Sequence, residues 1–129
     1  MKRTKPSGKK IRRVQIKRVY EPVGDHDGLR VLVDRLWPRS VAKAKAHVDL
    51  WLKDVAPSDA LRKRFHGHPT KWDDFVTAYS DELTKEPAKT AAASLRERVH
   101  DEPVTLLYAA RDEMHNNAVA LKGLLERPE

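Results

Sequence analysis

The stretch that decides the fold is Arg30-Val31-Leu32-Val33-Asp34-Arg35-Leu36-Trp37-Pro38-Arg39-Ser40. Its consecutive apolar residues predict a strand over residues 30–36 that is buried on both faces. Pro38 cannot donate a hydrogen bond to a neighbouring strand, so regular pairing has to end before it. A carboxylate, two guanidinium groups and an indole therefore stand at the carboxyl end of a buried strand, which is where α/β sheets usually bind ligands.

The charged side chains at this strand end allow two interpretations. A charge near a core is costly unless it is paired, so Arg35 could form a structural ion pair with Asp34 while Arg39 is solvated. Alternatively, Arg35 and Arg39 bind an anionic ligand, because a guanidinium offers two parallel donors to phosphate or carboxylate. The sequence places a site here without naming a reaction.

The rest of the chain alternates apolar strands with amphipathic helices. Further strands are expected at residues 11–20 and 104–110, and residues 48–52 fit either a helix or a strand. Helices are expected after Pro57, after Pro69, over residues 88–99, and from residue 113 or 115 onward. This alternation predicts an α/β fold: a small single domain with a mostly parallel sheet of three or four strands, flanked by helices on both faces.

The composition narrows the classes of protein that the chain can represent. At 129 residues it fits one domain, and it contains no cysteine, which excludes disulfides and thiolate chemistry. No apolar run approaches the roughly 20 residues of a membrane span, and no signal peptide follows the first residues. We therefore expect a cytoplasmic protein without a membrane partner; nothing in the sequence indicates its oligomeric state.

The formal net charge of +7 is unevenly distributed. Residues 1–18 hold nine Lys or Arg and no acid, which leaves 17 of the 26 basic residues beside all 19 acidic ones. Residues 1–10 lack apolar periodicity and are predicted to form a disordered basic arm, with the α/β domain over residues 11–129. Such an arm either contacts nucleic acid weakly and salt-dependently or only aids solubility.

A second polar cluster follows the predicted strand at 104–110. Arg111 and Asp112 come directly after it, and His115-Asn116-Asn117 lie at the expected start of the last helix. If this strand is a parallel neighbour of the strand at 30–36, both ends meet at one edge of the sheet, and the amino end of a helix attracts anions. We expect a crevice of positive potential there, although Asp112 or Asn116 could simply cap the helix.

The candidate site residues follow from this crevice. Asp34, His66 and Asp112 are candidates for proton transfer, because imidazole and carboxylate groups exchange protons near neutral pH when suitably placed. The candidates for ligand binding are Arg35, Trp37, Arg39, His115, Asn116 and Asn117, with Trp37 as a stacking surface. His66 and His68 could approach Asp25-His26-Asp27, but no spacing enforces the three or four converging ligands of a zinc site. No metal and no cofactor are predicted.

Four segments resemble the YeaO-like proteins, which form the domain-of-unknown-function family numbered 488. They are Ile16-Lys17-Arg18-Val19-Tyr20, Arg30 to Arg39, Trp51-Leu52-Lys53-Asp54-Val55-Ala56-Pro57-Ser58, and Leu106-Leu107-Tyr108-Ala109-Ala110 with His115-Asn116-Asn117-Ala118. The resemblance covers about residues 11–126 and has no established reaction to offer. It implies the same crevice, with Asp34, Arg35, Pro38 and Arg39 facing Asp112, His115 and Asn116.

Another branch of that family carries cysteines after the last strand and at the start of the last helix. The corresponding positions here are Tyr108-Ala109-Ala110 and His115-Asn116-Asn117, so thiol chemistry suggested for that branch does not transfer. The first hypothesis is therefore a protein that binds a small anionic ligand, a nucleotide or a phosphorylated metabolite, and whether it is an enzyme stays open. The alternative is a nucleic-acid-associated accessory protein that acts through the basic arm.

Overall fold

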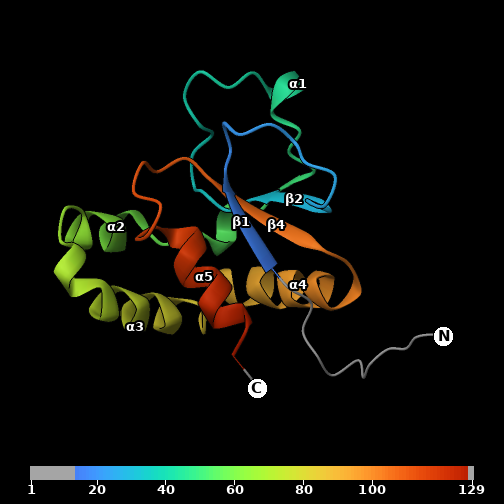
Figure 1. The fold of residues 1–129 in the computed structure, drawn as a ribbon. Coiled ribbons are helices and arrows are strands. Elements are labelled where there is room, and N and C mark those ends of the chain that lie inside the picture. The colour runs from blue at the N-terminus through green and yellow to red at the C-terminus, as the bar shows by residue number, and fades with distance from the viewer. Residues whose placement is uncertain (1–13, 128–129) are drawn as a thin grey trace.

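A four-stranded parallel sheet forms the centre of the computed structural model, which describes residues 14–127 (Figure 1). The strands β1 (Val14–Arg18), β2 (Leu29–Leu32), β3 (Leu50–Trp51) and β4 (Val104–Tyr108) lie in the order β1-β4-β2-β3. Strand β4 lies between β1 and β2, and all of its residues are buried. The predicted small α/β domain with a parallel sheet is confirmed, whereas the predicted arm at residues 1–10 lies outside the described residues.

The helices occupy the connections between the strands and follow the last strand. They are α1 (Lys43–Ala46), α2 (Asp59–Phe65), α3 (Trp72–Glu82), α4 (Ala88–Asp101) and α5 (Asn117–Leu125), with short 3-10 turns η1 (Lys53–Val55) and η2 (Pro69–Lys71). Helix α2 begins where the sequence predicts, because the Ser58 hydroxyl accepts a hydrogen bond from the Leu61 amide at 3.1 Å. The Glu82 carboxylate at the end of α3 accepts from the Ser58 amide at 2.9 Å, which ties α3 to the start of α2.

The two faces of the sheet are covered differently. Val31 and Val33 pack into the main core with residues of α2 to α5, whereas Leu32 and Leu107 belong to a second, smaller cluster with Trp37 and residues up to Trp51. In Figure 1, α3, α4 and α5 lie to one side of the sheet and α1 to the other. Helices therefore lie on both faces, as expected, but within residues 14–127 the second face has only the short helix α1. The rest of the cover on that face comes from an irregular segment.

Several element boundaries differ from the expectations. Strand β2 ends at Leu32 rather than residue 36, and helix α5 begins at Asn117 rather than at residue 113 or 115. The later start has a local cause, because the Asp112 carboxylate accepts the amides of Met114 and His115 and holds those residues in a turn. The ambiguous segment at 48–52 contains the edge strand β3.

A buried ion pair secures the amino end of the sheet. Arg30 is 2% exposed and lies 2.6 Å from the Asp27 carboxylate, which also accepts from Lys17 and the Gly24 amide at 3.0 Å each. Burial alone raises the pKa of Asp27, but the hydrogen bonds from Gly24, Lys17 and Arg30 outweigh it and lower the pKa to about 2. Arg30 also donates to the His47 carbonyl at 2.8 Å, so this pair connects β1, β2 and the segment before β3.

We predict that Asp27→Asn lowers the free energy of unfolding by about 3–5 kcal/mol at neutral pH, because it leaves Arg30 buried without a counter-ion. Urea denaturation measures this loss. The matched control is Asp81→Asn, whose carboxylate is 67% exposed and pairs with Lys85 at 3.2 Å; its midpoint should stay close to that of the unchanged protein. Equal losses for the two variants would contradict a structural role for the buried pair.

Candidate functional site

Asp34 joins the carboxyl ends of two strands to the start of the last helix. Its carboxylate accepts the Ala109 amide at 3.0 Å, just past β4, and the Asn117 side-chain amide at 3.1 Å. Asn117 also donates to the Val33 carbonyl at 2.8 Å. Burial raises the pKa of Asp34, an effect that the donors Asn117 and Ala109 oppose. The strand ends and helix start that the sequence brings to one edge therefore meet around one carboxylate.

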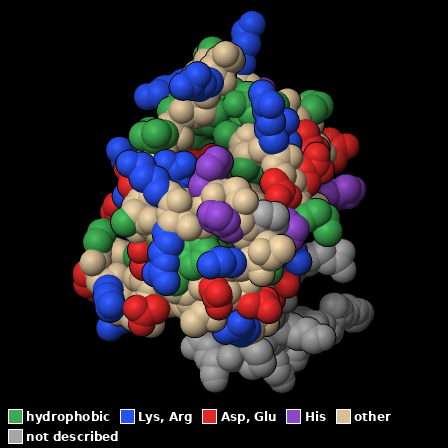
Figure 2. Space-filling view, turned by 90° about the vertical axis from the view of Figure 1, so that its left-hand side faces the viewer, with side chains coloured by type: hydrophobic (Ala, Val, Ile, Leu, Met, Phe, Trp, Pro, Cys, Tyr) green, Lys and Arg blue, Asp and Glu red, His purple; other side chains and the backbone are tan. Residues whose placement is uncertain are grey.

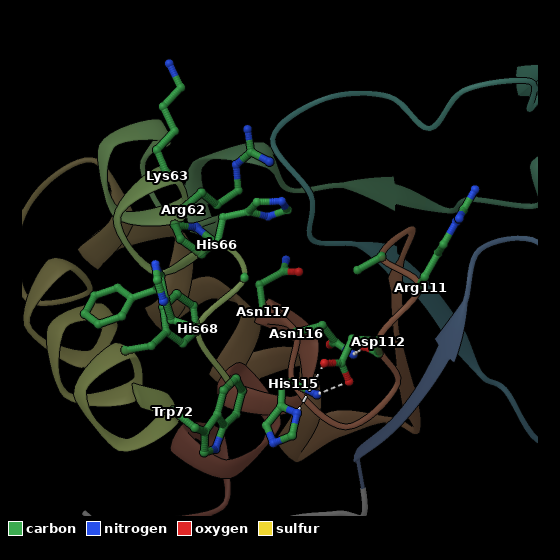
Figure 3. A pocket seen from close by; sticks show the side chains of 15 residues that line it. Arg62, Lys63, His66, His68, Trp72, Arg111, Asp112, His115, Asn116 and Asn117 are labelled. Carbon is green, nitrogen blue, oxygen red and sulfur yellow. Dashed lines mark hydrogen bonds and ion pairs between the residues drawn. The ribbon is translucent and has the colours of Figure 1, made fainter. Parts of the chain in front are cut away.

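A pocket of about 650 Å³ lies beside this junction, between α2 and the segment that precedes α5 (Figure 3). Two separate parts of the chain line it, residues 57–75 and residues 110–117. The lining residues are Pro57, Arg62, Lys63, Phe65, His66, Gly67, His68, Trp72, Phe75, Ala110, Arg111, Asp112, His115, Asn116 and Asn117. This volume falls within the roughly 300–1,000 Å³ of small-molecule sites.

Basic side chains dominate the charged groups of the pocket. Arg62, Lys63 and Arg111 line it together with three histidines, and Asp112 supplies its one carboxylate. In Figure 2, histidines lie near the middle of this face with Lys and Arg side chains beside them. The three Lys and Arg side chains outnumber the one carboxylate, so the lining has an excess of positive charge.

The carboxylate of Asp112 is already occupied by its own loop. It accepts the His115 and Met114 amides at 2.9 Å each and lies 3.2 Å from the His115 Nδ1. These backbone hydrogen bonds, that of His115 first, hold the pKa of Asp112 below its usual range. Asp112 is therefore an anion that holds the turn before α5 in place. Its interaction with His115 orients that ring next to Trp72, with 5.2 Å between the ring centroids.

Aromatic side chains form another part of the pocket lining. The Trp72 and Phe75 ring centroids are 5.5 Å apart, and those of Phe65 and Phe75 are 5.8 Å apart. Phe75 is buried, whereas Phe65 and Trp72 are half-buried. The pocket thus combines basic groups with an apolar aromatic wall.

Five of the predicted site residues line this pocket: His66, Asp112, His115, Asn116 and Asn117. Two of them are committed to the fold. Asn116 is buried, and its side-chain oxygen accepts the Val119 amide at 2.9 Å, which is the helix cap that the sequence left as an alternative. Asn117 is held by Val33 and Asp34. His66, at the end of α2, points toward the middle of the pocket in Figure 3.

Arg35 is not among the residues that line this pocket, and it does not form the ion pair with Asp34 that the sequence offered as an alternative. Its guanidinium donates to the carbonyls of Ala56 at 2.9 Å and Pro57 at 3.3 Å, and no ion pair within residues 14–127 joins it to Asp34. The reason is the direction of the chain after β2: Asp34 faces the Ala109 amide, so Arg35 reaches the segment before α2 instead. Arg35 therefore supports the loop that leads into the pocket.

Trp37 and Arg39 do not line the pocket either. Trp37 donates its indole N–H to the Val41 carbonyl at 2.7 Å and packs edge-on against Trp51, with 5.4 Å between ring centroids. Arg39 is exposed, and its carbonyl accepts the Tyr20 hydroxyl at 3.3 Å. Trp37 thus packs on the second face of the sheet, the Arg39 side chain is exposed, and neither lies in the pocket.

Several residues of the pocket were not predicted from the sequence. Arg62 and Lys63 belong to a short helix whose basic side chains are typical of a solvated face, and Trp72 fits the apolar stripe of α3. No local pattern signals their role, because it depends on how α2 lies over the strand ends. Arg111 was placed at the expected crevice by the predicted strand at 104–110, although it was not among the candidate site residues; it lies three residues past the end of β4.

Two further findings concern residues 14–127 only. Among them, no group of three or more His, Cys, Asp or Glu side chains is arranged to hold a metal ion. Within the same range, no helix has the length and apolar character needed to cross a membrane.

Comparison with known proteins places the chain among uncharacterised relatives. The family model described as "Inactive DUF488-N3 subclade" matches residues 13–128. "Uncharacterized protein YeaO" of Escherichia coli K12 is 40% identical over 112 residues, which cover 87% of this chain and 96% of that protein. "Uncharacterized protein Rv3073c" of Mycobacterium tuberculosis H37Rv is 41% identical over 113 residues, covering 88% and 93%. No solved structure matches the chain.

We predict that Arg35→Ala lowers the free energy of unfolding by about 1–3 kcal/mol, because it removes charged donors from the carbonyls of Ala56 and Pro57. Arg39→Ala is the matched control and should leave the midpoint of unfolding unchanged, since the Arg39 side chain is exposed. Chemical denaturation of the two variants provides the comparison. A larger loss for Arg39→Ala than for Arg35→Ala would contradict the placement of both side chains.

Proposed function

The chain belongs to the inactive DUF488-N3 subclade, and we propose that its pocket binds a small phosphorylated ligand without converting it. One observation carries the proposal. Arg62 from α2 and Arg111 from the loop after β4 line the same pocket, whose single carboxylate, Asp112, is already bonded within its own loop. A phosphate entering there gains donors from two segments without facing a free anion.

The donors of the pocket remain available to a ligand. Arg62 forms an ion pair with Asp59 at 3.1 Å, but both side chains are more than half exposed, and such a pair is weak enough to exchange for a phosphate. Figure 3 shows Arg62 and His66 together on one side of the pocket and Arg111 on the other, with the Arg111 side chain extended away from the middle. All three side chains are exposed, so they are free to turn toward a phosphate in the pocket and donate hydrogen bonds to it.

Binding without turnover fits the chemistry of the lining. The chain has no cysteine for a thiolate nucleophile. Asp34 is bonded to Ala109 and Asn117, and Asp112 to the amides of its own turn, so neither carboxylate is poised to take a proton from a ligand. The description of the subclade as inactive points the same way.

We predict that inorganic phosphate and AMP bind the full-length protein and that Arg62→Gln combined with Arg111→Gln weakens binding by about tenfold or more. The expected loss follows from the strength of charged hydrogen bonds, about 1.5–3 kcal/mol each. Isothermal titration calorimetry measures it, and thermal shift provides an independent readout because a ligand that binds the folded state raises the melting temperature. The matched control is Arg39→Gln, which changes an exposed arginine outside the pocket.

Three results would overturn this function. One is the absence of binding by either probe at concentrations up to about 10 mM, where even a weak site would be occupied. Another is an equal loss of affinity in Arg39→Gln and in the double variant. A third is conversion of AMP by the protein, which would show that the pocket is catalytic.

A second candidate function rests on the charge distribution of the sequence. Nine Lys or Arg stand in residues 1–18, and two of them have structural partners: Lys17 binds Asp27 at 3.0 Å, and Arg18 donates to the Ala109 carbonyl at 2.8 Å. The other seven lie outside the described residues. We propose that this basic segment gives the protein weak, salt-dependent contact with nucleic acid.

We predict that deleting residues 1–10 removes most binding to duplex DNA at low salt, whereas the Arg62→Gln/Arg111→Gln variant keeps it. Fluorescence anisotropy against salt concentration tests this, because phosphate contacts give a linear fall of log affinity with log salt. Binding that survives the deletion, or no binding at the lowest salt, would contradict the proposal.

A further inference from the structure

The aromatic wall of the pocket is more than a phosphate needs. Phe65, Trp72 and Phe75 line the same hollow as the basic groups, yet inorganic phosphate has no apolar surface and a sugar phosphate offers only the small C–H face of one ring to three aromatic rings. Phe75 is explained by the core, because it is buried and stacks on Tyr79 at 5.8 Å between centroids. Phe65 and Trp72 are only half-buried, so the core does not account for them fully.

Trp72 occupies a position that suits ligand contact. It borders the pocket on one side and, on the other, a smaller hollow of about 210 Å³ between α3 and α5. The ring of His115 lies edge-on to it at 5.2 Å, and Asp112 holds that histidine in place. In Figure 3 the Trp72 and His115 rings lie together at the border of the pocket opposite Arg62. One end of the pocket is thus aromatic and the other basic.

We infer that the ligand is a nucleoside monophosphate, with its base against Trp72 and Phe65 and its phosphate between Arg62 and Arg111. This inference rests on the proposed function and specifies its ligand. A planar base has an apolar face that can pack against this aromatic wall, and aromatic side chains stack on every base through its π-face. A free nucleotide and the terminal nucleotide of a strand share this chemistry, and both fit an open pocket.

The test compares ligands that share a phosphate and differ in the base. Dissociation constants are measured by calorimetry for AMP, ribose 5-phosphate and inorganic phosphate with the full-length protein. AMP should bind about tenfold tighter than ribose 5-phosphate or better, from the stacking of its base. Trp72→Leu should remove this preference, and Trp72→Phe, which keeps a ring, should retain most of it.

A second measurement does not depend on whether the variants fold. The indole N–H resonance of Trp72 should shift on addition of AMP and much less on addition of ribose 5-phosphate, while those of Trp37 and Trp51 should stay unchanged. Those two indoles donate to the carbonyls of Val41 and Asp34 and lie away from the pocket lining. They serve as internal controls.

The outcomes separate this inference from the proposed function. Equal affinities for AMP and ribose 5-phosphate, with an unchanged Trp72 indole, overturn the nucleoside monophosphate and leave phosphate binding intact. If AMP, ribose 5-phosphate and inorganic phosphate all fail to bind, both the nucleoside monophosphate and the proposed phosphate binding are overturned. A 5′-phosphorylated dinucleotide distinguishes a free nucleotide from the terminal nucleotide of a strand. Affinity at least equal to that of AMP supports a strand end, and much weaker affinity supports a free nucleotide. Either result supports a nucleoside monophosphate as the bound group.

Discussion

The Asp34 carboxylate is the interaction on which the rest of this structure depends. This carboxylate accepts hydrogen bonds from the Ala109 amide beyond β4 and from the Asn117 side chain at the start of α5. The backbone carbonyl of Asp34 accepts the Trp51 indole N–H at 2.8 Å. One residue thereby joins the ends of β2, β3 and β4 to the last helix. The burial of a carboxylate is costly, as the raised pKa of Asp34 reflects, and the hydrogen bonds from the Asn117 side chain and the Ala109 amide offset part of that cost. Without this junction, residues 110–117 would lose the attachment that positions them against α2.

The opposite end of the sheet uses charge for a different purpose. There Asp27 and Arg30 are both almost fully buried and form an ion pair, and Asp27 also accepts from the Gly24 amide while Arg30 donates to the His47 carbonyl. These two side chains are therefore committed to the fold. At the carboxyl end the basic groups Arg62, Lys63 and Arg111 are exposed around a hollow. The same residue types therefore stabilise one edge of the sheet and line an open pocket at the other, which is the edge where α/β sheets usually bind ligands.

The strands and the edge of the sheet that carries the pocket were predictable, because local patterns in the sequence encode them. The apolar runs around Leu32 and Leu106 specify buried parallel strands, and the strand ends indicate where a site would lie. The roles of Arg35 and Trp37 were not predictable, because they depend on the chain direction after β2 and on distant partners, the Ala56 carbonyl and the Trp51 ring. The place of Trp72 in the pocket wall was not predictable either, because it depends on how α2 and α3 pack beside the strand ends. The hydrophobic periodicity of a helix carries no information on that packing.

A single titration tests the central claim that the ligand site lies between α2 and the segment before α5. Amide chemical shifts of the full-length protein are followed while inorganic phosphate is added at constant ionic strength. Binding in the pocket predicts shifts concentrated in residues 62–68 and 110–117, with residues 37–41 unaffected. Shifts concentrated in residues 35–40, or confined to the basic residues before Val14, would contradict it.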